Sequence, residues 1–467
     1  MDILGMGALA QSEAMAAGSL SAVELMEASL GRIEAANRQV NAIVSLRSKD
    51  ALMAEAQAAD AMPRKGWLHG MPMAIKDLAD AEGLPTSMGS PLFAGQVAQT
   101  DSVFVGRLRA TGAIIIGKTN TPEFGLGSHT FNPVHGATCN PYDLAKSAGG
   151  SSGGAAAALA CGMVSVADGS DMMGSLRNPA GWNNVYGMRP SWGRVPGEPE
   201  GDMYLHQLST SGPMARCPRD LAALLDTMAG PDRRQPFGTS ADATLPQMGG
   251  QAATMRIGWL GDWGGAFPYA DGISALSEAA VGQIADLGHE VADVPPPFDA
   301  GRMWDAWITL RSFAVAGGLG ALFEDPEKRQ GLKPAAIWEI ERGLGLSARD
   351  VQRASEARSD WYRAAMDLFD RVDVLVLPSA QVWPFAVEEV HPTEIVGQAM
   401  DSYHRWMQVV VPASLIGLPV VNVPAGFGND GLPGGLQLIG RPGGDAQLLR
   451  LAQQWHEATH WPQVRRP

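Results

Sequence analysis

The spacing of apolar and polar positions predicts helices in the first part of the chain. Ser21 and Glu24 form a capping box, and apolar residues follow them at near-helical spacing. A helix is therefore expected over residues 21–36, within an N-terminal helical segment that covers residues 1–62.

From Met71 onward, short apolar runs alternate with helical stretches. The runs at 113–116 and 164–167 have the length and composition of strands, whereas 102–111 and 153–161 have helical spacing. This alternation is typical of the α/β fold class, in which helices cover both faces of a β-sheet.

The second half of the chain contains a helix-rich stretch and then returns to the mixed pattern. Residues 300–372 hold four tryptophans and precede a strand expected at 372–377. Residues 407–427 carry no charge, but three prolines break any membrane-spanning helix there, so a buried helix end, a turn and a strand are expected. The length alone suits about three domains, yet large α/β folds often run this long as one unit, so one large domain, 1–467, is expected.

Composition and charge narrow the classes of partner. The chain has a formal net charge of -14, which disfavours nucleic acid and anionic membrane surfaces and favours a neutral small molecule. Its three cysteines are scattered and odd in number, as expected for free thiols in a reducing compartment. The N-terminus lacks the features of a signal peptide, so a cytoplasmic location is expected.

Two short motifs match nucleotide and zinc sites, but their contexts argue against both. Residues 112–119 satisfy the phosphate-loop pattern, yet the residues between the glycines are themselves strand-like, and Pro122 interrupts any following helix. His456 and His460 satisfy the zincin pattern, but the seven residues that follow offer no third ligand. We expect a solvated terminal helix there, and no metal or cofactor.

A third motif offers an alternative nucleophile. Residues 149–153 satisfy the nucleophile-elbow pattern, which would make Ser151 the nucleophile of an α/β-hydrolase. The preceding residues, 143–148, do not form an apolar strand pattern, so the strand–turn–helix context of that motif is not expected.

Two serines and a lysine form the constellation that carries the chemistry. Ser151 and Ser175 lie 24 residues apart, each where the backbone must turn sharply. Lys76 follows the apolar run 71–75 and is expected near the end of an interior strand, where burial favours the neutral amine. A neutral lysine can serve as base for a serine without any histidine. The structural alternatives are turn serines and a surface lysine paired with Asp77.

The blocks around these residues resemble those of the amidase signature family. The resemblance implies a large mixed β-sheet covered on both faces by α-helices, with the signature core over residues 70–200 and a variable helix-rich stretch at 300–372. The matching blocks are Gly70–Asp77, Gly117–Gly125, 149–177, Arg177–Asn183, Gly417–Gly426 and Gly431–Arg441.

The same resemblance implies a role for each residue of the constellation. Lys76 is the base, Ser151 is a bridging serine that follows a cis peptide bond, and Ser175 is the acylated nucleophile. The backbone N–H groups of four successive residues form an oxyanion hole, and three further residues support the turn. The oxyanion-hole residues are Met172, Met173, Gly174 and Ser175, and the supporting residues are Ser152, Asp171 and Arg177.

One departure from the family pattern concerns the substrate pocket. The family usually has two glycines before the nucleophile, whereas this chain has Met173 and Gly174. We expect a reshaped pocket for a mainly apolar aryl or alkyl amide, with carbamates or esters as further substrates. The residues expected to bind the substrate are Phe124, Gly125, Leu126, Met173 and Trp182.

Two other functions remain as alternatives. One is the glutamine-hydrolysing component of a tRNA-dependent amidotransferase, although residues 120–124 read Asn-Thr-Pro-Glu-Phe where those chains typically read Asn-Met-Asp-Glu-Phe. The other is a catalytically silent binding protein of the same fold. The expected partner is a small-molecule amide, and a homodimer is compatible with the sequence.

Overall fold

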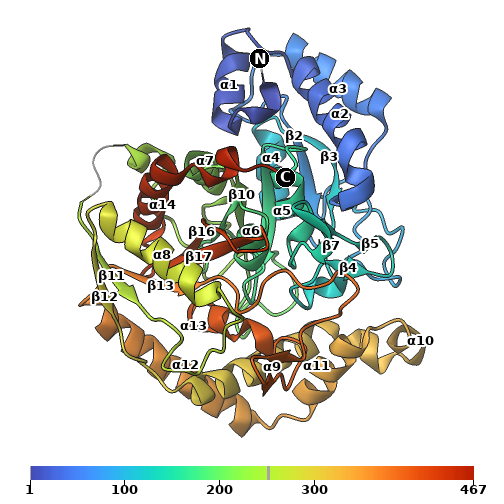
Figure 1. Ribbon diagram of the computed structural model, residues 1–467. Helices are drawn as coiled ribbons and strands as arrows, with labels where there is room; N and C mark the ends of the chain where they lie inside the picture. The colour runs from blue at the N-terminus through green and yellow to red at the C-terminus, as the bar shows by residue number, and fades with distance from the viewer. Residues whose placement is uncertain (1, 250–252) are drawn as a thin grey trace.

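An eight-stranded mixed β-sheet runs through the middle of the molecule, with helices on both sides (Figure 1). The computed structural model describes residues 2–249 and 253–467; Met1, within the expected 1–62 segment, lies outside the described residues. The sheet confirms the predicted fold class. In sheet order the strands are β12 (Glu290–Asp293), β11 (Arg256–Trp259), β13 (Val374–Pro378), β17 (Pro433–Ile439), β16 (Val420–Phe427), β9 (Tyr186–Arg189), β10 (Thr210–Ala215) and β8 (Val166–Asp171).

The sheet is parallel at one edge and antiparallel elsewhere. β11 pairs in parallel with both β12 and β13, and every other neighbouring pair is antiparallel. A strand in such a layer is covered on both faces and therefore has little need of polar residues. This explains the continuous apolar run of β13, whose residues are all buried.

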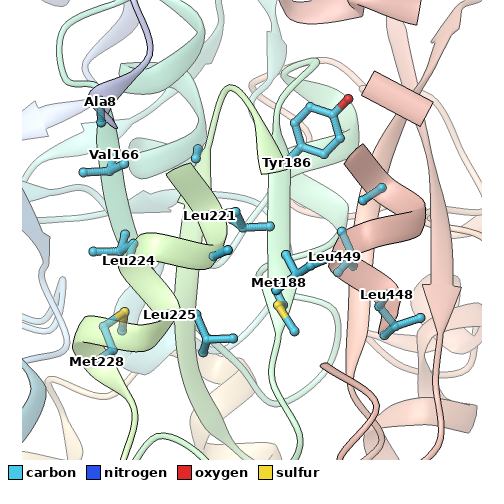
Figure 2. Close-up of a cluster of buried hydrophobic side chains, with 14 of the residues drawn as sticks. Ala8, Val166, Tyr186, Met188, Leu221, Leu224, Leu225, Met228, Leu448 and Leu449 are labelled. Atoms are coloured by element: carbon cyan, nitrogen blue, oxygen red, sulfur yellow. The ribbon is translucent and has the colours of Figure 1, made fainter. Parts of the chain in front are cut away.

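Alternate side chains of the strands enter two different cores. In β13, Val374 and Val376 join the core under α7, α8 and α14, whereas Leu375 and Leu377 join the core under α9 and α12. Figure 2 shows part of the first core, where α7 and α14 face β8 and β9. Its labelled residues are Ala8, Val166, Tyr186, Met188, Leu221, Leu224, Leu225, Met228, Leu448 and Leu449.

The helices form layers around this sheet. α2 confirms the predicted capping box, because Ser21 Oγ accepts from the N–H of Glu24 and the Glu24 side chain accepts from the Ser21 N–H. The helices are α1 (Ala8–Ala16), α2 (Ala22–Val40), α3 (Lys49–Ala61), α4 (Val103–Ala110), α5 (Gly153–Ala160), α6 (Asn178–Trp182), α7 (Pro218–Met228), α8 (Ile273–Asp286), α9 (Ala300–Glu324), α10 (Pro326–Arg329), α11 (Pro334–Leu344), α12 (Ala348–Phe369), α13 (Val411–Leu415), α14 (Asp445–Thr459) and α15 (Trp461–Val464).

A second, three-stranded sheet lies beside β8 and positions the lysine block. Its order is β1 (Ile43–Val44), β3 (Ile114–Thr119) and β2 (Pro72–Lys76), with β2 parallel to β3. β2 contacts β8, and Lys76 at the end of β2 lies next to Ser170 near the end of β8, with Nζ 3.0 Å from Ser170 Oγ. β3 occupies the segment that matched the phosphate-loop pattern, and it is a strand there, as predicted.

Helices α9 to α12 cover the lower side of the molecule in Figure 1 and make up the predicted helix-rich stretch. Among the described residues, α9 alone is long and apolar enough by composition to span a membrane, and 44% of its most apolar 18-residue window is buried. The uncharged segment 407–427 is broken as expected, into α13, a turn and β16.

Two local expectations were wrong. Residues Asp143–Ser147 do form a strand, β7, which pairs with the two-residue β6 (Cys139–Asn140) and is bridged at Lys146 to Ala386. It lies outside the main sheet, so polar side chains are tolerated. Helix α14 is not a solvated terminal helix, because it packs on β16 and buries His456, whose Nδ1 is 3.0 Å from the Tyr186 hydroxyl.

Gly187, in β9 at the middle of the main sheet, tests how tightly the turn after β8 packs on that sheet. A Cβ at this position would lie 2.0 Å from the carbonyl oxygen of Leu176. Gly187→Ala should therefore lower the free energy of unfolding by about 1–3 kcal/mol or more, measured by urea denaturation. In the matched control, Gly282→Ala, nothing lies within 4 Å of the new Cβ at this exposed position of α8, so stability should be unchanged or slightly higher. A wild-type midpoint for Gly187→Ala would contradict this packing.

Candidate active site

Lys76, the last residue of β2, lies among hydroxyl groups. Its Nζ is 2.7 Å from Ser151 Oγ, 2.8 Å from Ser152 Oγ and 3.0 Å from Ser170 Oγ. The residue is 1% exposed, so the surface lysine considered as an alternative is excluded. Asp77, its expected partner in that alternative, is instead 3.7 Å from the buried Nζ of Lys118.

The surroundings of Lys76 favour the neutral amine. Burial lowers the pKa of Lys76 to about 7, and the carboxylates of Asp168 and Asp171 oppose that shift only in part. Asp168 accepts the backbone N–H of Lys76 at 3.1 Å, and burial raises the pKa of Asp168 to about 6. Near neutral pH, a large fraction of Lys76 therefore carries a lone pair that can accept a proton.

Ser151 and Ser175 lie on two adjoining turns. The peptide bond between Gly150 and Ser151 is cis, the feature that the family resemblance implied. The N–H of Ser152 donates to the carbonyl oxygen of Ser175 at 3.3 Å, which joins the turn before α5 to the turn before α6. Ser151 is 2% exposed and Ser175 is 6% exposed, so both hydroxyls are largely shielded from bulk water.

The turn that carries Ser175 begins where β8 ends. Gly174 has φ +80°, a conformation that glycine adopts without steric cost, and a Cβ there would lie 2.9 Å from the side chain of Val410. Glycine is therefore required at position 174 for two separate reasons. The neighbouring Met173 is 3% exposed, belongs to the same hydrophobic cluster as Val410 and also lines a small cavity.

A buried ion-pair cluster fixes this turn. The Asp171 carboxylate is 2.9 Å from Arg177 Nη2 and also accepts the N–H groups of Gly174 and Leu176, at 2.9 and 3.1 Å. Burial alone would raise the pKa of Asp171, but the guanidinium groups of Arg177 and Arg189 hold it well below its usual range. The Asp171 charge is therefore compensated by two guanidinium groups, and its hydrogen bonds to Gly174 and Leu176 hold the backbone around Ser175 in one conformation.

The expected oxyanion hole needs correction at Gly174. Its N–H donates to Asp171 Oδ1, so it is already satisfied within the turn. In residues 2–249 and 253–467, no hydrogen bond uses the N–H of Met172, Met173 or Ser175. Three of the four predicted donors are therefore unused by the described protein, whereas the Gly174 N–H is taken up by the Asp171 carboxylate.

A small cavity of about 90 Å³ brings most of the predicted residues together. Ser151 and Ser175 both line it, although within the described chain no hydrogen bond joins their two hydroxyls. The other lining residues include four of the predicted substrate-binding residues, the predicted oxyanion-hole residue Met172, and several that sequence reasoning did not identify. They are Phe124, Gly125, Leu126 and Met173, then Met172, and then Leu78, Gly127, Ser128, Ser170, Ser209, Arg311 and Met407.

A larger cavity of about 570 Å³ adjoins the small one, and the two share Leu126, Gly127 and Ser128 as lining residues. Its walls are mainly aromatic and aliphatic, and the charged groups among them include Glu123 and Lys333. Further lining residues, drawn from the loop after β3, from α11 and from the segment before α13, are Phe131, Pro133, Leu332, Trp338, Tyr403 and Trp406.

Trp182, predicted to bind the substrate, is not among the residues that line the two cavities. It is 1% exposed and stacks on Trp406, with ring centroids 5.9 Å apart and an interplanar angle of 17°. Because α6 turns back onto the sheet after Ser175, the Trp182 ring packs beneath the site and supports Trp406, which does line the larger cavity.

Arg311 is the functional candidate that sequence reasoning missed. It lies on α9, is 3% exposed and lines the small cavity, far along the chain from either serine. A signal was present: Trp304, Trp307 and Val315 share its buried helical face, so a charged residue interrupts an apolar stripe at helical spacing. A buried charge on such a stripe needs a partner or a function.

The zincin and nucleophile-elbow motifs lie in surroundings that do not suit either chemistry. His456 lies on α14 and His460 ends it in a left-handed conformation, and no group of three or more potential metal-ligating side chains was found among the described residues. For the nucleophile-elbow alternative, the structure does contain a strand, β7, shortly before Ser151. However, β7 belongs to a polar two-stranded hairpin, whereas that motif requires a central sheet strand.

Comparisons with known proteins find similarity to amidases and to amidotransferase chains. A family model described as Amidase matches residues 24–449. A glutamyl-tRNA(Gln) amidotransferase chain from Chloroflexus aurantiacus is 35% identical over 97% of this chain and 96% of its own. An acylamidase from Rhodococcus erythropolis is 32% identical over 98% of this chain and 96% of its own.

Solved structures agree with the sequence relatives. The structure of a bacterial aryl acylamidase of the amidase signature family superposes with a TM-score of 0.91 at 28% identity, covering 99% of both chains. That of 6-aminohexanoate cyclic dimer hydrolase with its substrate superposes with a TM-score of 0.90 at 27% identity, covering 100% of this chain and 99% of the other.

Proposed function

This chain belongs to the amidase signature family, and we propose that it hydrolyses the C–N bond of a mainly apolar carboxylic amide through an acyl-enzyme on Ser175. The observation that carries the proposal is the contact between Lys76 and Ser151. A buried amine with a pKa of about 7 lies 2.7 Å from Ser151 Oγ, and Ser175 lines the same cavity. This arrangement supplies a base, a relay and a nucleophile from side chains of the protein itself.

In the proposed mechanism, protons move toward Lys76 as Ser175 attacks. Ser175 Oγ gives its proton to Ser151 Oγ, Ser151 gives its own proton to the neutral Nζ of Lys76, and the new C–O bond forms at the substrate carbonyl. The unused N–H groups of the turn, those of Met172, Met173 and Ser175, are the donors proposed to stabilise the oxyanion. Lys76 then returns the proton through Ser151 to the departing amine, and the C–N bond breaks. Water hydrolyses the acyl-enzyme by the same relay.

The cavities support a bulky, mainly apolar substrate. Met172 and Met173 line the small cavity, and the larger cavity adds Trp338 and Tyr403 from elements far along the chain. Methionine and aromatic walls adapt to apolar groups of different shapes. Carbamates and esters present the same acyl carbonyl, so we include them as further substrates.

Glutamine hydrolysis is the second candidate function, because a glutamyl-tRNA(Gln) amidotransferase chain is among the relatives at 35% identity. The structural comparison favours a stand-alone amidase: the aryl acylamidase superposes with a TM-score of 0.91, whereas the corresponding amidotransferase chain from Thermotoga maritima superposes with 0.80.

A catalytically silent binding protein of the same fold is the third candidate function. The presence of Lys76, Ser151 and Ser175 in the chain argues against it. A cytoplasmic location and a homodimer remain expectations.

Replacing the two serines tests their roles. Ser175→Ala should remove nearly all turnover and all acyl-enzyme formation, whereas Ser151→Ala should lower kcat by about 10²-fold or more because the proton relay is interrupted. The matched control is Ser209→Ala, a serine on the same small cavity that should retain most activity. Mass spectrometry after reaction with a serine-directed acylating probe locates the adduct. An adduct on Ser151 would support the nucleophile-elbow alternative instead.

The pH dependence tests Lys76 as the base. Because the relay needs the neutral amine and burial lowers the pKa of Lys76 to about 7, kcat/KM should rise as pH increases through about 7 and level off above it. Lys76→Ala should leave little activity and remove that rise. A profile of unchanged shape in the variant, or activity that falls as pH rises from about 6 to about 8, would refute the assignment.

Substrate size tests the apolar cavities. A phenyl ring that buries about 100 Å² of apolar surface gains about 2.5 kcal/mol, so kcat/KM should be much higher for an anilide or long-chain amide than for acetamide. Trp338→Ala, which opens the larger cavity, should reduce that preference and leave acetamide turnover unchanged. A preference for acetamide or for glutamine would contradict the proposed substrate class.

A further inference from the structure

Arg311 presents a charged group to the catalytic cavity from a helix outside the signature core. It lines the small cavity that also contains Ser151 and Ser175, and it is 3% exposed. Arg311 has no role in the proposed proton relay. A guanidinium group placed within a cavity of about 90 Å³ that holds the nucleophile must lie close to any substrate bound there.

Most of the guanidinium group is already held by protein partners. Arg311 Nε is 2.6 Å from Glu339 Oε1, and Nη2 is 2.7 Å from the hydroxyl of Tyr403. Glu339 also accepts from Ser312 Oγ at 2.7 Å and from Tyr403 at 2.9 Å. This network fixes the position of the group and pairs its positive charge with a fully buried carboxylate.

The remaining nitrogen is poorly satisfied. Among the described residues, the only hydrogen-bond partner of Arg311 Nη1 is the thioether sulfur of Met172, at 3.4 Å. A thioether is a weak acceptor, and Nη1 carries two N–H groups. Met172 is itself a lining residue of the small cavity and immediately follows β8. Its flexible side chain can give way to a better acceptor.

We propose that Arg311 is a specificity-determining residue, and that its Nη1 binds a second carbonyl oxygen of the substrate, separate from the scissile carbonyl and a few bonds away from it. The inference rests on the proposed function, because it assigns a substrate feature to the same cavity. The preferred substrates are then apolar amides with one additional neutral acceptor, such as oxo-acyl amides, and not plain alkyl amides.

Charge distinguishes a neutral carbonyl from a carboxylate at this position. Glu339 already compensates Arg311, so a substrate carboxylate would bring an unpaired charge into a buried site, which is costly. A carbonyl oxygen needs only the free N–H of Nη1. When it binds, the buried donor exchanges a weak sulfur contact for a charge-assisted hydrogen bond, which is among the stronger hydrogen bonds in proteins.

The test compares substrate pairs that differ only by C=O against CH₂. Anilides of 3-, 4- and 5-oxo acids are each paired with the anilide of the corresponding simple acid, and succinic acid monoanilide provides the carboxylate arm. In the wild-type protein, kcat/KM should be about tenfold to a hundredfold higher for at least one oxo member than for its partner. The carboxylate should show no such gain.

A double variant removes the recognition group while keeping the buried site neutral. In Arg311→Met combined with Glu339→Gln, the ratio between the oxo and simple anilides should fall to about one, and turnover of the simple anilide should persist. The matched variant Met172→Leu removes only the sulfur acceptor and should keep or increase the ratio. If Arg311 had a purely structural role, its replacement would lower kcat/KM equally for the oxo and simple anilides and leave their ratio unchanged.

Binding measurements separate this inference from the proposed function. The same pairs are titrated by calorimetry into Ser175→Ala, in which turnover cannot interfere. If the wild-type protein hydrolyses none of the amides but the oxo members bind about tenfold or more tightly, the proposed function fails and the inference stands. If the amides are hydrolysed but every pair gives a ratio near one in both assays, the inference is refuted and the proposed function stands. If the double variant does not fold, the kcat/KM ratios of the wild-type protein and the binding ratios of Ser175→Ala still test the inference.

Discussion

The cost of burying the Lys76 amine is the constraint on which the rest of the site depends. An ammonium group in that position would need strong acceptors, but its nearest partners are the hydroxyls of Ser151, Ser152 and Ser170. Burial therefore lowers its pKa to about 7, and the same hydroxyls that fail to hold the charge are placed to exchange protons with it. In the proposed mechanism this burial makes Lys76 the base, and two serine turns close around the lysine to exclude solvent from it.

The Asp171 cluster gives those turns their shape. Arg177 reaches from the turn to Gln437 Oε1 on β17 at 2.6 Å and to the carbonyl oxygen of Val410 at 2.9 Å, so the C-terminal part of the chain braces the nucleophile turn. This explains why an apolar segment near residue 410 and a strand near residue 435 belong to the same functional unit as Ser175. It also explains why the Gly174 N–H is already committed when a substrate arrives, since the Asp171 carboxylate requires it.

The substrate side of the site is built from a different part of the chain. Lys76, Ser151 and Ser175, the residues of the proposed relay, come from one part of the chain. The cavity residues Arg311, Trp338, Tyr403 and Met407 come from α9, α11 and the segment before α13. A chemical centre made of short local turns can stay constant while helices from another region set the volume and polarity of the cavity. Fixed chemistry with variable walls is a general way for one fold to act on different substrates.

The sequence by itself determined the features that local patterns encode. The capping box at Ser21 predicted the start of α2, the apolar runs predicted β3 and β13, and the glycine-flanked positions of Ser151 and Ser175 marked sharp turns. Only the tertiary structure decided which side chains meet. It places Trp182 beneath the site, commits the Gly174 N–H to Asp171 and brings Arg311 into the cavity across more than a hundred residues of chain. The physical reason is that turns and helix caps depend on neighbouring residues, whereas burial, charge compensation and cavity walls depend on contacts between distant segments, which no local pattern records.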